Sequence, residues 1–210
     1  MAGVAMKTLT RHQVRSRNTL TRLLHAAEEI FVRDGFAAAQ IDDIAARAER
    51  SIGAIYMHFK SKEDLFLALI EHRISSYIDR FTDHMQKCTT RQQRLDAFRE
   101  FFIGLVRDRA YHVLTLEFKL FALRHPEWKE RYQKAFETMK RSHSDVGVEQ
   151  LFGHLSRGAK TEFEVARTAL GPMINGLVLE SYFEPDVLSE KALRQALRRV
   201  LDALILIDPQ

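Results

Sequence analysis

The first candidate for catalytic chemistry in this sequence is the run His143, Ser144 and Asp145, which contains the three side-chain types of a nucleophilic triad. Adjacent residues on a helix do not face one another, so these three groups cannot form such a triad. The chain has no HExxH, GxSxG, GxGxxG or P-loop motif, and its nine histidines are scattered. Its one cysteine, Cys88, excludes an internal disulfide and a CxxC site. We therefore predict no enzyme activity, no cofactor and no metal site.

Basic side chains gather at the N-terminal end and offer a different chemistry, the binding of a polyanion. Residues 1–62 contain ten Lys and Arg against six Asp and Glu, whereas residues 63–210 contain twenty-two of each. The basic residues of the acid-free segment 7–22 are Lys7, Arg11, Arg15, Arg17 and Arg22. A basic segment on a neutral body indicates a partner such as nucleic acid, and the alternative is a solvated tail. We expect residues 1–16 to form a disordered basic arm.

Apolar spacing at three- and four-residue steps predicts an all-α fold without strands. A first helix is expected over residues 19–34, with Gly35 as its C-terminal stop. Two short helices follow, around Ile44 and Ile55, joined by a polar turn. Such a pair is typical of the helix-turn-helix, whose second helix enters the major groove of DNA. The outer face of that second helix holds Ser51, Gly53, Tyr56, Met57 and His58.

Ser61 reads as the N-cap of a long fourth helix, within a capping box that ends at Asp64. Five more helices are expected, at about residues 91–108, 111–124, 127–154, 161–183 and 188–206. This predicts a helix-turn-helix DNA-binding domain at 17–62 and a larger helical ligand-binding and dimerisation domain at 63–210. The longest uncharged stretch, 168–179, is shorter than the ~20 residues that span a bilayer. No membrane association and a cytoplasmic location are therefore expected.

The stretch from Leu24 to Leu69 resembles the N-terminal domain of TetR-family transcriptional regulators. The matching residues are Ala27, Phe31, Gly35, Phe36, Ile44, Ala45, Ala48, Ser51, Gly53, Ile55, Tyr56, His58, Phe59, Ser61, Lys62 and Glu63. The resemblance implies that Ser51, Tyr56, His58 and Lys62 touch the DNA backbone. Physically, Gly53 permits close approach of the helix, and Ala54 and Met57 can contact a thymine methyl group. The full set of predicted DNA-binding residues is Gln40, Ser51, Ile52, Gly53, Ala54, Tyr56, Met57, His58 and Lys62.

The sequence departs from the family pattern at four places. Glu49 stands where the turn usually has Gly, which adopts positive φ without strain. Gln40 replaces the usual Thr or Ser cap, and a lost cap costs ~1 kcal/mol. Ile52 replaces a common Lys, and Met57 a frequent polar or aromatic residue. These changes leave the predicted fold intact and bear on how strongly the domain binds DNA.

A single three-helix DNA-binding domain makes few base contacts, so we expect a two-fold symmetric dimer that binds a palindromic operator. The predicted homodimer contact is 161–206. One apolar stripe comprises Leu193, Leu197, Val200, Leu201 and Leu204, and the partner face comprises Gly171, Ile174, Gly176, Leu177, Leu179 and Tyr182. The alternative is that both stripes face one internal core. Pro172 predicts a kink or break near Thr168.

Residues 63–170 are rich in aromatics, which could line an apolar cavity or form ordinary core. The predicted ligand-binding residues are Phe81, Met85, Phe102, Glu117, Phe121, Trp128 and Phe136. Glu117 lies in an otherwise apolar run and could pair with a cationic ligand or a nearby base. The sequence therefore predicts a dimeric DNA-binding regulator. It favours a repressor over an activator, released from its operator by an unidentified small apolar inducer. The alternative is a helical small-molecule-binding or interaction protein whose DNA-binding head has degenerated.

Overall fold

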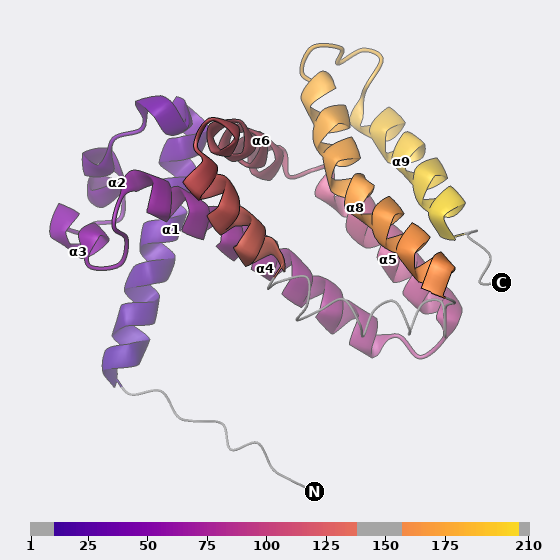
Figure 1. The fold of residues 1–210 in the computed structure, drawn as a ribbon, viewed down its shortest axis with the longest axis horizontal. Helices are drawn as coiled ribbons and strands as arrows, with labels where there is room; N and C mark the ends of the chain where they lie inside the picture. The colour runs from indigo at the N-terminus through magenta and orange to yellow at the C-terminus, as the bar shows by residue number, and fades with distance from the viewer. Residues whose placement is uncertain (1–10, 138–156, 206–210) are drawn as a thin grey trace, which may run out of the picture. The chain divides into compact units, whose positions relative to one another are not determined.

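The structure is a computed structural model that describes residues 11–137 and 157–205. Its helices are α1 (Arg11–Ala38), α2 (Ile41–Arg47), α3 (Ile52–Tyr56), α4 (Lys62–Lys87), α5 (Arg91–Leu105), α6 (Arg109–Arg124), α8 (Arg157–Glu180) and α9 (Glu190–Ile205) (Figure 1). Residues 126–137 are helical as well. Across these described ranges there is no strand, so the all-α prediction is confirmed.

The chain divides into an N-terminal unit, residues 1–69, and a C-terminal unit, residues 70–210. The division falls inside α4, seven residues after the predicted boundary at Lys62. The helix continues across it because the apolar spacing of α4 is uninterrupted, with Leu65, Leu69 and Ile74 all buried.

Helix α1 begins at Arg11, so residues 11–16 are helical and the prediction of a disordered arm is wrong there. Arg11 to Leu24 contain no Gly or Pro, and nothing in that stretch interrupts helix propagation. Residues 1–10 of the predicted arm lie outside the described residues. The predicted stop at Gly35 is confirmed, because its φ of 74° and ψ of 162° break the helix geometry there.

The core of the N-terminal unit joins α1, the short helices and the start of α4. Phe31, Ile44 and Ile55 are almost fully buried there. The ring of Phe66 on α4 lies 4.8 Å from that of Phe31 and 4.7 Å from that of Phe36, measured between centroids. Burial of Ile44 and Ile55 holds α2 and α3 in this core and leaves the outer face of α3 exposed.

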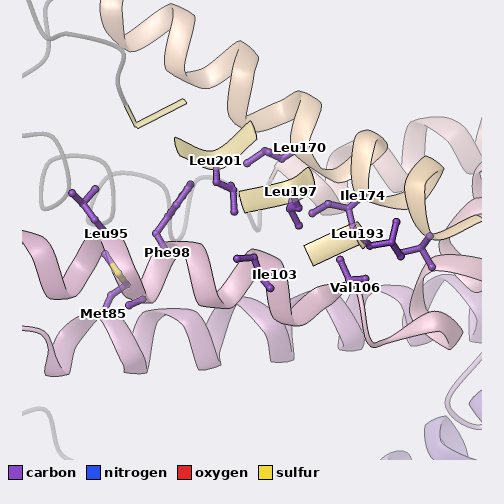
Figure 2. Packing of buried hydrophobic residues seen from close by; sticks show 12 residues of the cluster. Met85, Leu95, Phe98, Ile103, Val106, Leu170, Ile174, Leu193, Leu197 and Leu201 are labelled. Atoms are coloured by element: carbon purple, nitrogen blue, oxygen red, sulfur yellow. The ribbon is translucent and has the colours of Figure 1, made fainter. Parts of the chain in front are cut away.

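In the C-terminal unit, α5 packs on α9, α6 packs on α8, and α8 packs on α9. Figure 2 shows Leu193, Leu197 and Leu201 of α9 pointing into the cluster that contains Ile103 and Ile174. These three leucines are at most 2 % exposed within a single chain. The predicted assignment of this stripe to a dimer surface is therefore wrong, and the internal-core alternative holds for it. The side chain of Leu204 lies outside the described residues.

A buried polar link connects α6 to α8. Nδ1 of His112 lies 2.5 Å from Oδ1 of Asn175, and its Nε2 lies 2.9 Å from the carbonyl oxygen of Leu105. His112 and Asn175 are both almost fully buried, so each satisfies a polar group that water cannot reach. Helix α8 runs through Pro172 from Arg157 to Glu180, so the helix does not break near Thr168. The kink, the other form of that prediction, stays a prediction.

Candidate functional site

The turn between α2 and α3 is a Schellman motif. The backbone N–H of Arg50 donates to the carbonyl of Ala45 at 2.9 Å, and the N–H of Glu49 donates to that of Ala46 at 3.1 Å. Glu49 occupies the position where Gly is usual and adopts a φ of 54°. No other non-glycine residue in the described ranges has a positive φ. The tight turn is thus preserved, with Glu49 held in a strained conformation.

Helix α2 starts without a side-chain cap, as the Gln40 substitution predicted. Gln40 is the N-cap residue, with φ −104° and ψ 141°, and its side chain accepts no capping hydrogen bond. Its Nε2 instead donates to the carbonyl of Ala38 at 2.9 Å. The exposed amide thus sits at the start of α2, where a capping hydroxyl would otherwise stand.

Helix α3 does have its cap. The Ser51 hydroxyl oxygen accepts from the N–H of Ala54 at 3.2 Å, which leaves the hydroxyl proton free to donate outward. The side chains of Ile52, Tyr56 and Met57 are 40 %, 54 % and 87 % exposed. Gly53 and His58 are exposed as well, and Ala54 is half-buried. The predicted outer face is therefore exposed, and it forms one continuous surface of mixed polar and apolar side chains on α3 and the turn after it.

Lys62 has a different environment from the one that the family resemblance implied. Its ammonium donates to the carbonyls of Ala37 and Ala39, at 3.1 and 3.0 Å, and lies 4.8 Å from the centroid of the Phe36 ring. Ala37 lies in the last turn of α1 and Ala39 directly follows the helix, so Lys62 satisfies acceptors that have no intrahelical partner. The side chain is half-buried, and a DNA contact by Lys62 stays a prediction.

Helix α4 begins as predicted. The Ser61 hydroxyl accepts from the N–H of Asp64 at 3.2 Å, which confirms Ser61 as the N-cap. The carboxylate of Asp64 accepts from the N–H of Lys60 at 2.9 Å, one residue before the cap.

An open groove of about 560 Å³ lies between α4 and α5 in the C-terminal unit. Phe81, Phe101 and Leu105 give it an apolar wall, and Arg80, His84, Glu100 and Arg107 give it a polar rim. At one side, Asp108 accepts from the guanidinium of Arg73 and from the hydroxyl of Tyr77. Burial, together with this bond, raises the pKa of Tyr77, so the phenol keeps its proton.

The predicted ligand-binding residues do not converge on that groove. Phe81 lines it, whereas Met85 is buried in the core cluster and Phe102 packs against that cluster. Phe121 and Trp128 lie on α6 and the helix after it, with ring centroids 6.3 Å apart, and Phe136 stacks on Tyr132 at 5.8 Å. Glu117 is half-buried, not enclosed as its apolar neighbours suggested. Met85 is therefore core, whereas the predicted aromatics are half-buried, and a ligand contact by any of them stays a prediction.

The exposed side of α8 carries an apolar face. Met173 is 41 % exposed, Leu179 38 % and Phe183, just beyond the helix, 73 %. Gly171 and Gly176 are exposed on the same helix, and a Cβ at either would meet no atom within 4 Å. Glycine in mid-helix costs about 1 kcal/mol relative to alanine, and none of the described residues requires it at these positions. Of the predicted partner face, Ile174 is buried and Leu177 half-buried.

Sequence reasoning passed over Arg50, which is half-buried and donates from Nη1 to the carbonyl of Glu49 at 2.8 Å. Its position directly before the cap residue Ser51 was the available signal. Within the described residues, no cluster of three metal-ligating side chains is present. No described helix is both long and apolar enough to cross a membrane.

Two family models match this chain. One, described as bacterial regulatory proteins of the tetR family, matches residues 23–69. The other, described as the C-terminal part of BetI-type transcriptional repressors, matches residues 91–206, which is more than half of the 210 residues. The chain belongs to the TetR family.

Individual relatives agree with this assignment. Over 85 residues the chain is 36 % identical to the transcriptional activator FasR of Mycolicibacterium smegmatis, a match that covers 40 % of this chain and 39 % of that protein. Over 83 residues it is 30 % identical to the regulator QacR of Staphylococcus aureus, covering 40 % and 44 %. The chain thus spans about two fifths of the length of these TetR-family relatives.

A solved structure shares the fold over nearly its full length. FadR of Bacillus subtilis, solved in complex with stearoyl-CoA, superposes with a TM-score of 0.61 at 20 % identity. The superposition covers 89 % of this chain and 97 % of that one. The likeness therefore extends the shared TetR fold to both units.

Proposed function

We propose that this TetR-family protein is a dimeric, DNA-binding transcriptional regulator, and a repressor that a small molecule releases from its operator. The observation that carries the proposal is the intact α2–turn–α3 unit, with Ser51 capping α3 and the outer face of α3 exposed. In a domain that had lost DNA binding, the α2–α3 turn would be free to change, yet here it is kept even though Glu49 must adopt a strained positive φ. This favours DNA binding over the alternative of a small-molecule-binding protein without DNA affinity.

The exposed side chains of α3 divide into two roles. Tyr56 and Ser51 present hydroxyls that can donate to backbone phosphates, which set affinity and register. Met57 is 87 % exposed and packs on little of its own chain, so its thioether is available to a thymine methyl group in the major groove. Phosphate contacts act on every sequence, whereas Met57 acts on sequence choice.

The experiment selects DNA fragments from the host genome with purified full-length protein and measures affinity for a selected and an unrelated fragment. We expect Tyr56→Phe to weaken binding to both fragments alike. Met57→Ala should instead reduce the preference for the selected fragment, by about 1 kcal/mol for each thymine methyl contact that is lost. If the wild-type protein retains no fragment at low salt, the DNA-binding proposal is wrong.

The exposed apolar face of α8 supports the dimer. A Cβ at Gly171 or Gly176 would meet no described atom, so these glycines allow the backbone of a second copy to approach closely, and Met173 and Leu179 would be removed from water by it. Met173→Glu with Leu179→Glu should give a monomer in analytical ultracentrifugation. The matched control is Leu120→Glu, because Leu120 is 55 % exposed but lies on α6. A double variant that sediments like the wild type would exclude this face.

The groove between α4 and α5 supports a ligand site for a small, largely apolar molecule, since Phe81, Phe101 and Leu105 form its wall. A bound ligand that prefers one dimer geometry must weaken operator binding, and by linkage DNA must weaken ligand binding equally. Compounds that raise the melting temperature are added to the operator assay. Coupling of about 1–3 kcal/mol would shift operator affinity by roughly 5- to 150-fold. Stabilising compounds that never change operator affinity would refute the coupling.

A further inference from the structure

A second groove, of about 550 Å³, lies on the N-terminal unit. Its lining residues come from α1 and from the end of the turn before α3: Arg15, Asn18, Thr19, Thr21, Arg22 and Arg50. Guanidinium, hydroxyl and amide groups of this kind all donate hydrogen bonds, and no acid lines the groove. The chemistry therefore suits a ligand rich in anionic oxygen atoms.

The arginines of this groove keep most of their positive charge uncompensated. Residues 1–27 contain no Asp or Glu, and the described residues give Arg15 no ion pair. Arg22 has only a 3.9 Å contact with the exposed carboxylate of Glu49, and Arg50 donates to a backbone carbonyl. Elsewhere, Arg33, Arg47, Arg73, Arg99, Arg107 and Arg198 each contact a carboxylate directly.

The α1 segment that carries Arg15 and Arg22 has little to do in the core. None of residues 15–22 is buried, and from Arg15 onward the first fully buried side chain of α1 is Leu23. Arg15 and Arg22 are seven residues apart, which is about two helical turns, so they lie on one face. Arg17 lies about 200° around the helix from Arg15, on the opposite face, and does not line the groove.

We infer that Arg15, Arg22 and Arg50 form a second DNA-binding surface, which holds backbone phosphates beside the bases that α3 reads. The inference rests on the proposed DNA-binding function. Duplex DNA is the partner that fits, because Arg50 directly precedes Ser51, the cap of the recognition helix, and so the groove and α3 adjoin in one unit. Arginine forks match phosphate geometry, and such contacts fix register without reading sequence.

The test measures binding of full-length protein to a selected operator and to an unrelated duplex between 50 and 200 mM salt. Each lost phosphate contact reduces the slope of log affinity against log salt by about 0.9, so Arg15→Ala with Arg22→Ala should reduce it by about 1.8. For each contact removed, the affinity loss across that salt range becomes about 3- to 4-fold smaller. Both duplexes should respond alike, because phosphates are common to all sequences.

The matched control is Arg17→Ala, which removes the same charge from the opposite face of the same helix. It should leave the slope unchanged, and hydroxyl-radical protection should shrink at the outer edges of the operator only in the Arg15→Ala, Arg22→Ala variant. Glu49→Gln removes the carboxylate that contacts Arg22 and should tighten binding to both duplexes. Circular dichroism checks that α1 remains helical, which alanine favours.

An unchanged slope in the double variant, or an equal change in Arg17→Ala, would overturn this inference while operator selection by wild-type protein still stands. Wild-type protein that selects no DNA would overturn the proposed function itself. The two failures are therefore distinguishable in one set of measurements.

Discussion

Replacing Glu49 by Gly should stabilise the protein, because Glu49 holds a left-handed backbone conformation in the turn between α2 and α3. A non-glycine residue in that region costs about 1–2 kcal/mol, whereas glycine adopts it without a Cβ clash. Glycine also gives the unfolded chain more freedom, which returns about 0.5–1 kcal/mol of that gain. The contact between Glu49 and Arg22, at 3.9 Å with both side chains exposed, adds little. The expected net stabilisation is about 0.5–1 kcal/mol.

The assay is urea unfolding followed by circular dichroism, with Glu49→Ala as the control. Alanine removes the same carboxylate but keeps a Cβ, so Glu49→Ala should match the wild type and lie below Glu49→Gly. In a thermal scan the melting temperature of the glycine variant should be about 1–4 °C higher, because 1 kcal/mol of stability shifts the melting temperature of a chain of this size by about 2–4 °C. Equal stability of the glycine and alanine variants would refute the argument from backbone strain.

Three further predictions concern packing and buried polar groups. Leu197→Ala should destabilise the fold by about 2–5 kcal/mol in urea unfolding, because the side chain is fully buried in the core, and unchanged stability would place it at an interface instead. Lys62→Met should lower the free energy of unfolding by about 1–2 kcal/mol, because the carbonyls of Ala37 and Ala39 lose their donor. If stability is unchanged and the salt dependence of DNA binding changes, Lys62 instead binds phosphate. His112→Phe should lower the free energy of unfolding by about 1–3 kcal/mol, because Asn175 is left buried without this partner, and thermal melting should detect the loss.

The local features of this protein could be predicted from short stretches of sequence. Ser51 and Ser61 cap helices because each bonds to a backbone N–H three residues later, and that contact depends on almost nothing else. The helix stop at Gly35 and the strain at Glu49 are local too, because each depends on the backbone φ of a single residue. The start of α1 was misplaced because propensity and polar composition decide a helix end only weakly.

The tertiary structure alone decided which way an apolar or charged side chain faces. The α9 stripe at Leu193, Leu197 and Leu201 has the same spacing whether it meets α5 and α8 or a second copy, and only packing between distant segments assigns it to the core. Lys62 meets carbonyls more than twenty residues earlier in the chain, a contact that no local pattern records. In the same way, the charge of Arg15, Arg22 and Arg50 was evident from composition, but the groove that unites them forms only when the turn before α3 packs beside α1.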